Sequence, residues 1–271
     1  MSVTFKSENH KYESNDGTNI NWLSVTSLIS KFKEPFDTIG TSVKVSKNKK
    51  SKWYGMTPEE IRNAWETESK RSTDLGTWFH NQRESDLLNH GTITFSGVEI
   101  PIIKPLTNEE GHKIAPEQKL KSGLYPEHLI YLKSGGICGQ SDLVEVVNDT
   151  VNIFDYKTNK EIKSKGFTNW EGKTKRLFIP LSHLDDCNLI HYTLQLSMYM
   201  YMILKHNPQL KPGELILYHI TFEEQAKDRY DNPIYKIDDQ GNFIVKETTE
   251  IKVPYLRQEC VDIIKWLKAN K

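Results

Sequence analysis

Cysteine is scarce in this 271-residue chain, and its distribution argues against several classes of protein. The three cysteines, Cys138, Cys187 and Cys260, lie far apart, and no CxxC pair occurs. This distribution argues against a structural zinc site and against a four-thiolate iron–sulfur cluster. It also lacks the dense cysteine framework of a small secreted scaffold.

The sequence also has neither an excess of charge of one sign nor a long apolar run. Lysine plus arginine and aspartate plus glutamate number 36 each, so the formal net charge is zero and any anion-binding surface must be local. The longest apolar stretch, near residues 199–204, is far shorter than the ~20 residues that a membrane span requires. Residues 1–6 lack the apolar segment of a signal peptide. We therefore expect a cytoplasmic protein that is not secreted.

The residues that are present suit a mixed fold with a sizeable core, since 37% of them are apolar. Thr57 and Glu60 form a capping box at the start of one expected helix. The helices expected lie at 24–33, 57–70, 73–89, 185–205 and 254–269. The strands expected lie at 127–132, 137–147, 151–156 and 214–222, with hairpins in the first 25 residues (turning at 15–17) and over 234–245. Residues 40–52 are lysine-rich and expected to form an exposed loop, 92–122 are expected to be irregular with one hairpin, and 160–180 are polar and basic. This order predicts one α/β domain over residues 1–271, with a central mixed β-sheet flanked by helices.

The stretch 139–160 carries the most informative pattern. Asp142 stands near the start of one strand, and Asp155 and Lys157 stand at the end of the next. A turn over 148–150 places Asp142 opposite Tyr156 and beside Asp155, and a two-residue spacing puts Asp155 and Lys157 on one face of the sheet. Two carboxylates can hold Mg²⁺ or Mn²⁺, and a lysine can orient the attacking water. The pattern favours phosphodiester hydrolysis over charges that merely solvate a strand end.

Three motifs in this order resemble a known family. G-x-x-D, a strand hairpin and D-x-K are similar to the active site of the PD-(D/E)xK nuclease superfamily. The sequence GTWFH at 76–80 resembles the G-T-x-x-H of its RecB-like exonuclease group, and QLSMY at 195–199 matches that group's Q-x-x-x-Y. The resemblance also extends to phage and mitochondrial-type exonucleases. Ser141 replaces the proline that precedes the first motif aspartate in some members.

The resemblance implies a restriction-endonuclease-like core and a division of the chain. The matched nuclease core spans about half of the chain, at 73–205. Residues 1–57 would add an N-terminal hairpin, a helix and a lysine-rich loop, and residues 206–271 would add C-terminal strands and a closing helix.

The resemblance also implies a role for each motif residue. His80, Asp142 and Asp155 would bind the metal, and the backbone carbonyl of Tyr156 would complete its shell. Lys157 would position the attacking water. Taken alone, His80 is typical of an ordinary, partly buried histidine; its place in the motif is what makes it a candidate ligand.

Further side chains would support this site. Gln195 and Tyr199 share one helix face; the resemblance places Gln195 beside the catalytic lysine and Tyr199 beside the substrate phosphate. Glu127, at the start of a strand, would be an additional ligand or a water-orienting base, or simply a strand-start charge. Glu84 lies one turn beyond the motif histidine, where it either holds that ring or is a solvated helix charge.

A basic segment follows the D-x-K motif. Residues 157–176 hold seven cations and two anions, with aromatic residues between them. Cations bind a phosphate backbone and aromatic rings stack on unpaired bases, although a charge run is often just a solvated face. The residues expected to bind DNA are Lys160, Lys163, Lys165, Trp170, Lys173, Lys175 and Arg176.

These observations together predict a deoxyribonuclease that depends on Mg²⁺ or Mn²⁺ and acts on single-stranded or duplex DNA ends as an exonuclease, in a bacterial or phage-infected cell. Three alternatives stay open: a structure-specific or flap endonuclease, a non-catalytic DNA-binding subunit, and a metal hydrolase with another substrate. The chain has no G-x-x-x-x-G-K-[ST] motif, so a helicase, polymerase or recombination partner would be a separate protein.

Overall fold

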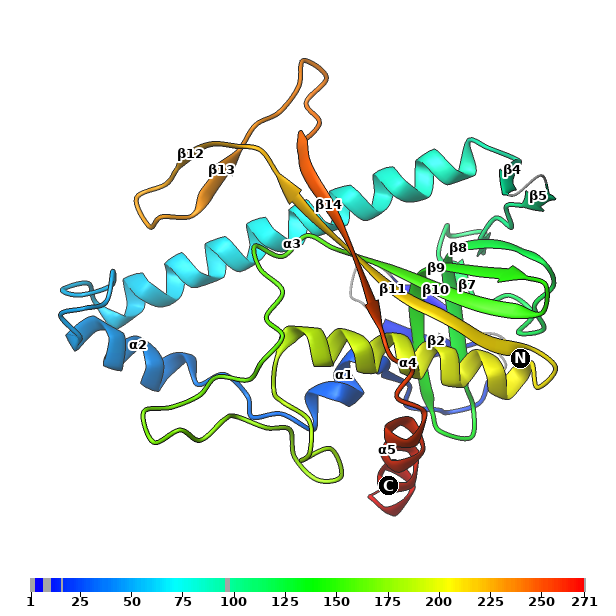
Figure 1. The fold of residues 1–271 in the computed structure, drawn as a ribbon, viewed down its shortest axis with the longest axis horizontal. Coiled ribbons are helices and arrows are strands. Elements are labelled where there is room, and N and C mark those ends of the chain that lie inside the picture. Colours follow the sequence, from blue (N-terminus) through cyan, green and yellow to red (C-terminus); the bar gives the residue numbers. More distant parts are fainter. Residues whose placement is uncertain (1–2, 7–10, 16, 96–97, 271) are drawn as a thin grey trace.

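A computed structural model describes residues 3–6, 11–15, 17–95 and 98–270. Its centre is a mixed six-stranded sheet in the order β14-β11-β10-β9-β3, in which β8 also pairs with β9 (Figure 1). Strands β8, β9 and β10 form the expected antiparallel meander, and β10 pairs with β11 in parallel. The mixed α/β class is confirmed. The strands of this sheet are β3 (Leu23–Ser24), β8 (Gly123–Leu132), β9 (Ile137–Val147), β10 (Thr150–Lys157), β11 (Lys211–Phe222) and β14 (Val245–Val253).

The turn between β9 and β10 contains two residues rather than three. Asn148 and Asp149 have φ of 49° and 59°, the left-handed conformation that matches the twist of a two-residue hairpin. The ladder is therefore displaced by one position from the predicted register, and Phe154 pairs with Leu143. The predicted pairing of Asp142 with Tyr156 was wrong by one residue for this reason.

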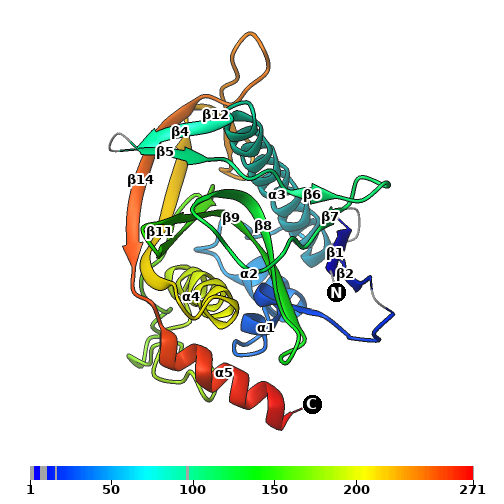
Figure 2. The same cartoon turned by 90° about the vertical axis from the view of Figure 1, so that its right-hand side faces the viewer.

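Helix α4 (Asn188–His206) connects the two parallel strands β10 and β11. Such a crossover is required because parallel neighbours cannot be joined by a tight turn. The helix is largely buried against one face of the sheet, where α1 (Val25–Ser30) and α5 (Arg257–Ala269) also pack (Figure 2). The expected helices at 24–33, 185–205 and 254–269 are confirmed within a few residues at each end.

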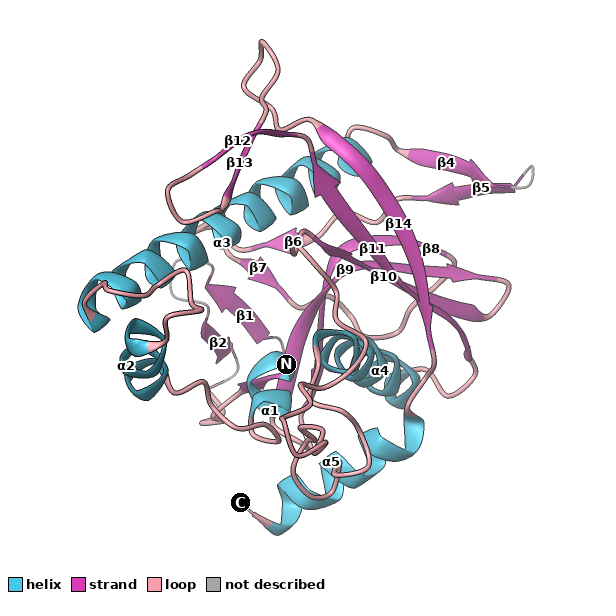
Figure 3. Ribbon diagram, turned by 60° about the vertical axis from the view of Figure 1, so that its left-hand side comes forward, coloured by secondary structure: helices cyan, strands magenta, loops and turns pink. Residues whose placement is uncertain are grey.

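Helix α3 (Pro58–Leu88) is a single element of 31 residues, where the sequence predicted two helices. Its capping box between Thr57 and Glu60 is confirmed. No glycine or proline interrupts residues 70–73, and ion pairs of Arg71 with Glu68 and of Lys70 with Asp74 follow helical spacing across the predicted break. The long helix crosses the molecule and brings residues of its second half to the sheet (Figure 3).

Residues 40–52 were predicted to be an exposed loop, but most of them belong to α2 (Thr38–Lys47). The carboxylate of Asp37 accepts a hydrogen bond from the Gly40 N–H at 2.8 Å and so caps the helix. Ser42 is buried and accepts a hydrogen bond from Arg62 of α3 at 3.1 Å. The small serines let α2 approach α3, and this polar contact replaces the apolar stripe by which helices are usually predicted.

The N-terminal hairpin is confirmed as β1 (Val3–Lys6) and β2 (Lys11–Ser14), but its turn is not at 15–17, which follow β2. Asp16 and the connecting residues 7–10 lie outside the described residues. One hairpin inside 92–122 is confirmed as β4 (Thr92–Phe95) and β5 (Val98–Pro101). The same region adds β6 (Leu106–Thr107) and β7 (Lys113–Ile114), and β7 pairs with β1 in a second sheet.

The hairpin predicted over 234–245 is partly correct. Residues 238–242 form a tight turn with Gly241 at φ 84°, and a bridge joins Ile237 to Phe243. Pro233–Tyr235 (β13), however, pairs with Glu224–Lys227 (β12), and β14 pairs with β11. β14 was not predicted, because it is an edge strand of mostly exposed lysine, glutamate and threonine and so lacks the apolar residues that indicate a strand. In the part of the chain that the structure describes, no helix has the length and apolarity to cross a membrane. The proposed division at residues 57, 73 and 205 stays a prediction.

Candidate active site

Three elements bring a histidine and two carboxylates together beside the middle of strands β8 and β9, so Glu127 and Asp142 do not lie at the strand starts that the sequence predicted. His80 comes from α3, Glu127 from β8 and Asp142 from β9. The His80 Nδ1 lies 3.3 Å from Asp142 Oδ1 and 3.9 Å from Glu127 Oε1. One donor atom of each residue lies within 4.8 Å of the others, so the three could share one metal ion.

The backbone at Glu127 departs from the regular ladder. The pairs Pro126–Leu143 and His128–Ser141 flank it in unbroken register, which places Glu127 opposite Asp142. Its φ is 48°, a left-handed conformation that is rare outside glycine and that clusters at functional sites. Two carboxylates facing each other repel unless a cation lies between them.

Asp142 is also tied to the neighbouring strand. Its Oδ2 accepts a hydrogen bond from the backbone N–H of Tyr156 at 2.7 Å. The β9–β10 ladder ends at the pair of Leu143 and Phe154, and Asp142 and Asp155 are the next residues on each strand. The ring of Tyr156 meets the His80 ring edge-on at 6.1 Å between centroids. The role of the Tyr156 carbonyl as a ligand stays a prediction.

Asp155 and Lys157 form a buried ion pair beside this group. The Lys157 Nζ lies 2.5 Å from Asp155 Oδ2, which confirms that the two side chains share one face of the sheet. Asp155 is only 1% exposed. The group of three possible ligands found in the described residues does not include Asp155. Its role as a metal ligand therefore stays a prediction, and Glu127 takes the third position in the geometry.

The ionisation of His80 and Asp142 follows from their burial and from the charges beside them. Burial alone would lower the pKa of His80, but the Asp142 and Glu127 carboxylates outweigh it and raise that pKa to about 10. Burial raises the pKa of Asp142, yet His80, Lys157 and the Tyr156 N–H together lower it below its ordinary value. A bound divalent cation would take over the role of the His80 proton between these carboxylates.

The pKa of Asp155 shifts in the opposite direction to that of Asp142. Burial raises the pKa of Asp155 to about 6, Asp142 adds to the rise, and Lys157 opposes it. Burial would lower the pKa of Lys157, but Asp155 and then Asp142 raise it above its ordinary value. The ammonium is therefore held charged in a site almost closed to solvent.

Helix α4 contributes the expected glutamine and tyrosine and one residue that the motif did not indicate. The Gln195 Nε2 donates to the Tyr199 hydroxyl at 3.2 Å, and both side chains are buried. The Lys157 Nζ lies 4.7 Å from the centre of the Tyr192 ring. Tyr192, Gln195 and Tyr199 are spaced i, i+3 and i+7, so the helical period alone places Tyr192 on the same face. Gln195 is hydrogen-bonded to Tyr199 and Lys157 is paired with Asp155, so the expected place of Gln195 beside Lys157 stays a prediction.

A cleft of about 720 Å³ opens over this group. His80, Glu127, Asp142, Gln195 and Tyr199 all line it. Gly139, the glycine of the G-x-x-D motif, lies against the Tyr199 ring in its wall. The sequence did not indicate two further wall residues, Gln140, which donates a hydrogen bond to Glu127, and Lys113, which pairs with Glu84.

Glu84 and the basic segment differ from the expectations. Glu84 binds Lys113 at 2.8 Å and is only partly exposed, so it is neither a solvated charge nor a partner of His80 in this structure. Ion pairs within the chain engage four of the six cations expected to bind DNA, and Lys163 and Lys165 form none with described residues. The engaged cations are Lys160 with Glu68, Lys173 with Glu171, Lys175 with Asp186 and Arg176 with Asp185. Trp170 is 92% exposed and Phe167 is 74% exposed, as stacking on a base would need.

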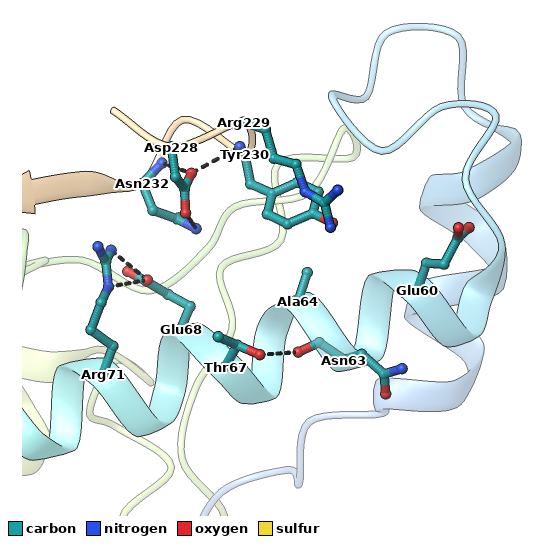
Figure 4. A pocket seen from close by; sticks show the side chains of 10 residues that line it. All are labelled: Glu60, Asn63, Ala64, Thr67, Glu68, Arg71, Asp228, Arg229, Tyr230 and Asn232. Atoms are coloured by element: carbon teal, nitrogen blue, oxygen red, sulfur yellow. Dashed lines mark hydrogen bonds and ion pairs between the residues drawn. The ribbon is translucent and has the colours of Figure 1, made fainter. Parts of the chain in front are cut away.

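A second pocket, of about 340 Å³, lies between the first half of α3 and residues 228–232 (Figure 4). Its charges are largely satisfied within the chain, because Glu68 pairs with Arg71 and Asp228 accepts hydrogen bonds from the Tyr230 and Asn232 N–H groups. None of the predicted site residues lines it. The candidate site is therefore the cleft around Asp142.

Comparison with known proteins adds no assignment. No family model matches the chain, and no curated protein matches it. A solved structure described as "Crystal structure of SSO0001" is similar at 14% identity, over 95% of this chain and 80% of that one, with a TM-score of 0.33. A TM-score this low supports no inference about fold family or function.

Proposed function

We propose that this chain is a metal-dependent deoxyribonuclease of the PD-(D/E)xK type, built on a restriction-endonuclease-like core. It hydrolyses phosphodiester bonds from DNA ends with Mg²⁺ or Mn²⁺. The observation that carries the proposal is the convergence of His80, Glu127 and Asp142 beside the buried pair of Asp155 and Lys157. Residues of motifs far apart in the sequence, His80, Asp142, Gln195 and Tyr199, line one cleft, which supports a common function.

The donor set fits a hard divalent cation. Two carboxylates and one imidazole are ligands that suit Mn²⁺, and the carboxylates suit Mg²⁺. A bound ion would lower the pKa of a water and offset charge on the phosphate. The facing carboxylates of Glu127 and Asp142 need such a cation, or the proton that His80 now holds between them.

The protein's own groups supply the remaining chemistry. Lys157 is buried, charged and held by Asp155, so its ammonium can orient the attacking water and stabilise the charge that develops on the phosphate. Tyr199 and Gln195 close the α4 side of the cleft, where the scissile phosphate would lie. Lys163 and Lys165 form no ion pair with described residues, so they can contact the DNA backbone beyond the site.

Cleavage of labelled DNA tests this proposal. Linear single-stranded and duplex DNA, labelled at the 5′ end, and covalently closed circles are incubated with Mg²⁺ or Mn²⁺. Lys157→Ala serves as the inactive variant, and Lys265→Ala on the surface of α5 serves as the matched control. Shortening of linear DNA by the wild type and the control, with intact circles, supports the exonuclease.

Other outcomes separate the alternatives. Cut circles indicate an endonuclease on the same residues. Binding of DNA without any cleavage indicates a binding module. Metal binding without salt-sensitive DNA binding indicates a hydrolase with another substrate, since phosphate contacts release counterions. Full activity of Lys157→Ala would overturn the assigned role of this lysine.

A further inference from the structure

A lysine from the second sheet reaches into the cleft. Lys113, on β7, places its Nζ 2.8 Å from Glu84 Oε1 and 2.9 Å from Glu84 Oε2. The same Nζ lies 3.6 Å from Glu127 Oε2. The three side chains are 23%, 18% and 14% exposed, so water screens them only in part.

Glu127 uses its two oxygens in different directions. Oε1 faces His80 at 3.9 Å, whereas Oε2 faces Lys113 and also accepts a hydrogen bond from Gln140. One carboxylate thus joins the group of possible metal ligands to the ammonium. Sites that hold two divalent ions place them about 3.5–4 Å apart and need carboxylates that reach both.

We propose that the Lys113 ammonium occupies the position of a second cation in this cleft, so that the chain binds one divalent ion where its carboxylates would otherwise hold two. The inference rests on the proposed metal-dependent function. Glu84 and Glu127 provide oxygen ligands on either side of the ammonium, and a hard cation would be held by the same atoms. Lys113 supplies that positive charge from a side chain that cannot dissociate, and the group of His80, Glu127 and Asp142 keeps the exchangeable ion.

The arrangement predicts a change in metal stoichiometry when the ammonium is removed. In Lys113→Met, Glu84 and Glu127 lose their shared cation while keeping their oxygens. A second ion then replaces the positive charge that these two partly buried carboxylates have lost. Lys113→Arg retains the charge and keeps one ion.

Counting bound Mn²⁺ tests the proposal without reference to activity. Calorimetry and the electron paramagnetic resonance of free Mn²⁺ are applied to the wild type, Lys113→Met, Lys113→Arg and the double variant Lys113→Met/Glu84→Gln. We expect one ion per chain in all of them except Lys113→Met, which binds two. Asp142→Asn supplies the background from surface carboxylates. Circular dichroism melts establish that each variant is folded.

The outcomes separate this inference from the proposed function. A wild type that binds no Mn²⁺ above background overturns the proposed function. A wild type that binds two ions, or a folded Lys113→Met that still binds one, overturns only the role of Lys113.

If Lys113→Met does not fold, Glu84→Gln gives a second test. Lys113, released from Glu84, then pairs with Glu127 and competes with the metal. We expect about 10-fold weaker Mn²⁺ binding, the size typical for loss of a group that orients a ligand. Unchanged affinity in this variant contradicts the proposal.

Discussion

The backbone N–H of Tyr156 donates a hydrogen bond to Asp142 Oδ2 at 2.7 Å, while Asp142 Oδ1 lies 3.3 Å from His80. The two oxygens of Asp142 therefore have different partners. Oδ2 ties β9 to β10 where the ladder ends, and Oδ1 faces His80, where the proposed metal ion would bind. Any substitution of Asp142 tests both roles together, unless the new side chain still accepts the Tyr156 N–H.

Asp142→Asn makes that separation, because an amide oxygen can accept the same hydrogen bond but carries no charge. We expect Mn²⁺ affinity to fall below detection while the melting temperature stays near that of the wild type. Asp155→Asn should weaken Mn²⁺ binding less, because Asp155 pairs with Lys157 and not with the group around His80. Titration calorimetry on both variants measures the difference, and equal losses would restore Asp155 as an equivalent ligand.

Lys157→Ala is expected to lower the cleavage rate by about 100-fold or more, the size typical for loss of a preorganised group that stabilises transition-state charge. DNA binding should persist, since the Lys157 side chain is only 15% exposed and is already paired with Asp155. The change removes the ammonium that lowers the pKa of Asp155. That pKa therefore rises further, and the carboxyl binds a proton more readily. Lys157→Met preserves more of the packing against Tyr192 and should be equally inactive. Electrophoretic mobility shifts and labelled-DNA cleavage measure the two effects separately.

Two glycines of the site predict opposite effects on stability. A Cβ at Gly139 would lie 2.6 Å from Tyr199 Cε1, whereas one at Gly76 would meet Thr158 Oγ1 at an ordinary 3.4 Å. Gly139→Ala overpacks a buried ring and should cost about 1–3 kcal/mol. Gly76→Ala replaces glycine inside a helix and should stabilise by up to about 1 kcal/mol. Urea denaturation of both variants gives the comparison, and a stable Gly139→Ala with full activity would show that Tyr199 moves freely.

Much of the site was predictable because its signals are local in sequence. The D-x-K spacing determines that Asp155 and Lys157 share a face, and the i, i+4 spacing does the same for Gln195 and Tyr199. The register could not be placed to one residue, because the sequence N-D-T does not show which two residues adopt positive φ. Lys113 could not be predicted at all. It reaches the cleft from a separate sheet, through a contact with Glu84 that no periodicity encodes.

The buried histidine of β8 predicts a specific loss of stability in acid. His128 is 4% exposed, and its ring meets Tyr125 at 5.3 Å between centroids. Burial lowers the pKa of His128 from 6.5 to about 4. Between these two values the unfolded chain binds a proton that the folded chain does not, so the free energy of unfolding falls as the pH drops from about 6.5 to about 4 and levels off below. The shift corresponds to about 3 kcal/mol at its full extent.

His128→Leu removes this proton linkage while keeping an apolar side chain in the core. The difference in unfolding free energy between the wild type and His128→Leu should therefore change by about 3 kcal/mol from pH 7 to pH 4, in favour of the variant at low pH. Other carboxyl groups titrate in both proteins and cancel from the difference. A difference for His128→Leu that stays constant across this range would show that the His128 ring accepts a proton inside the folded chain.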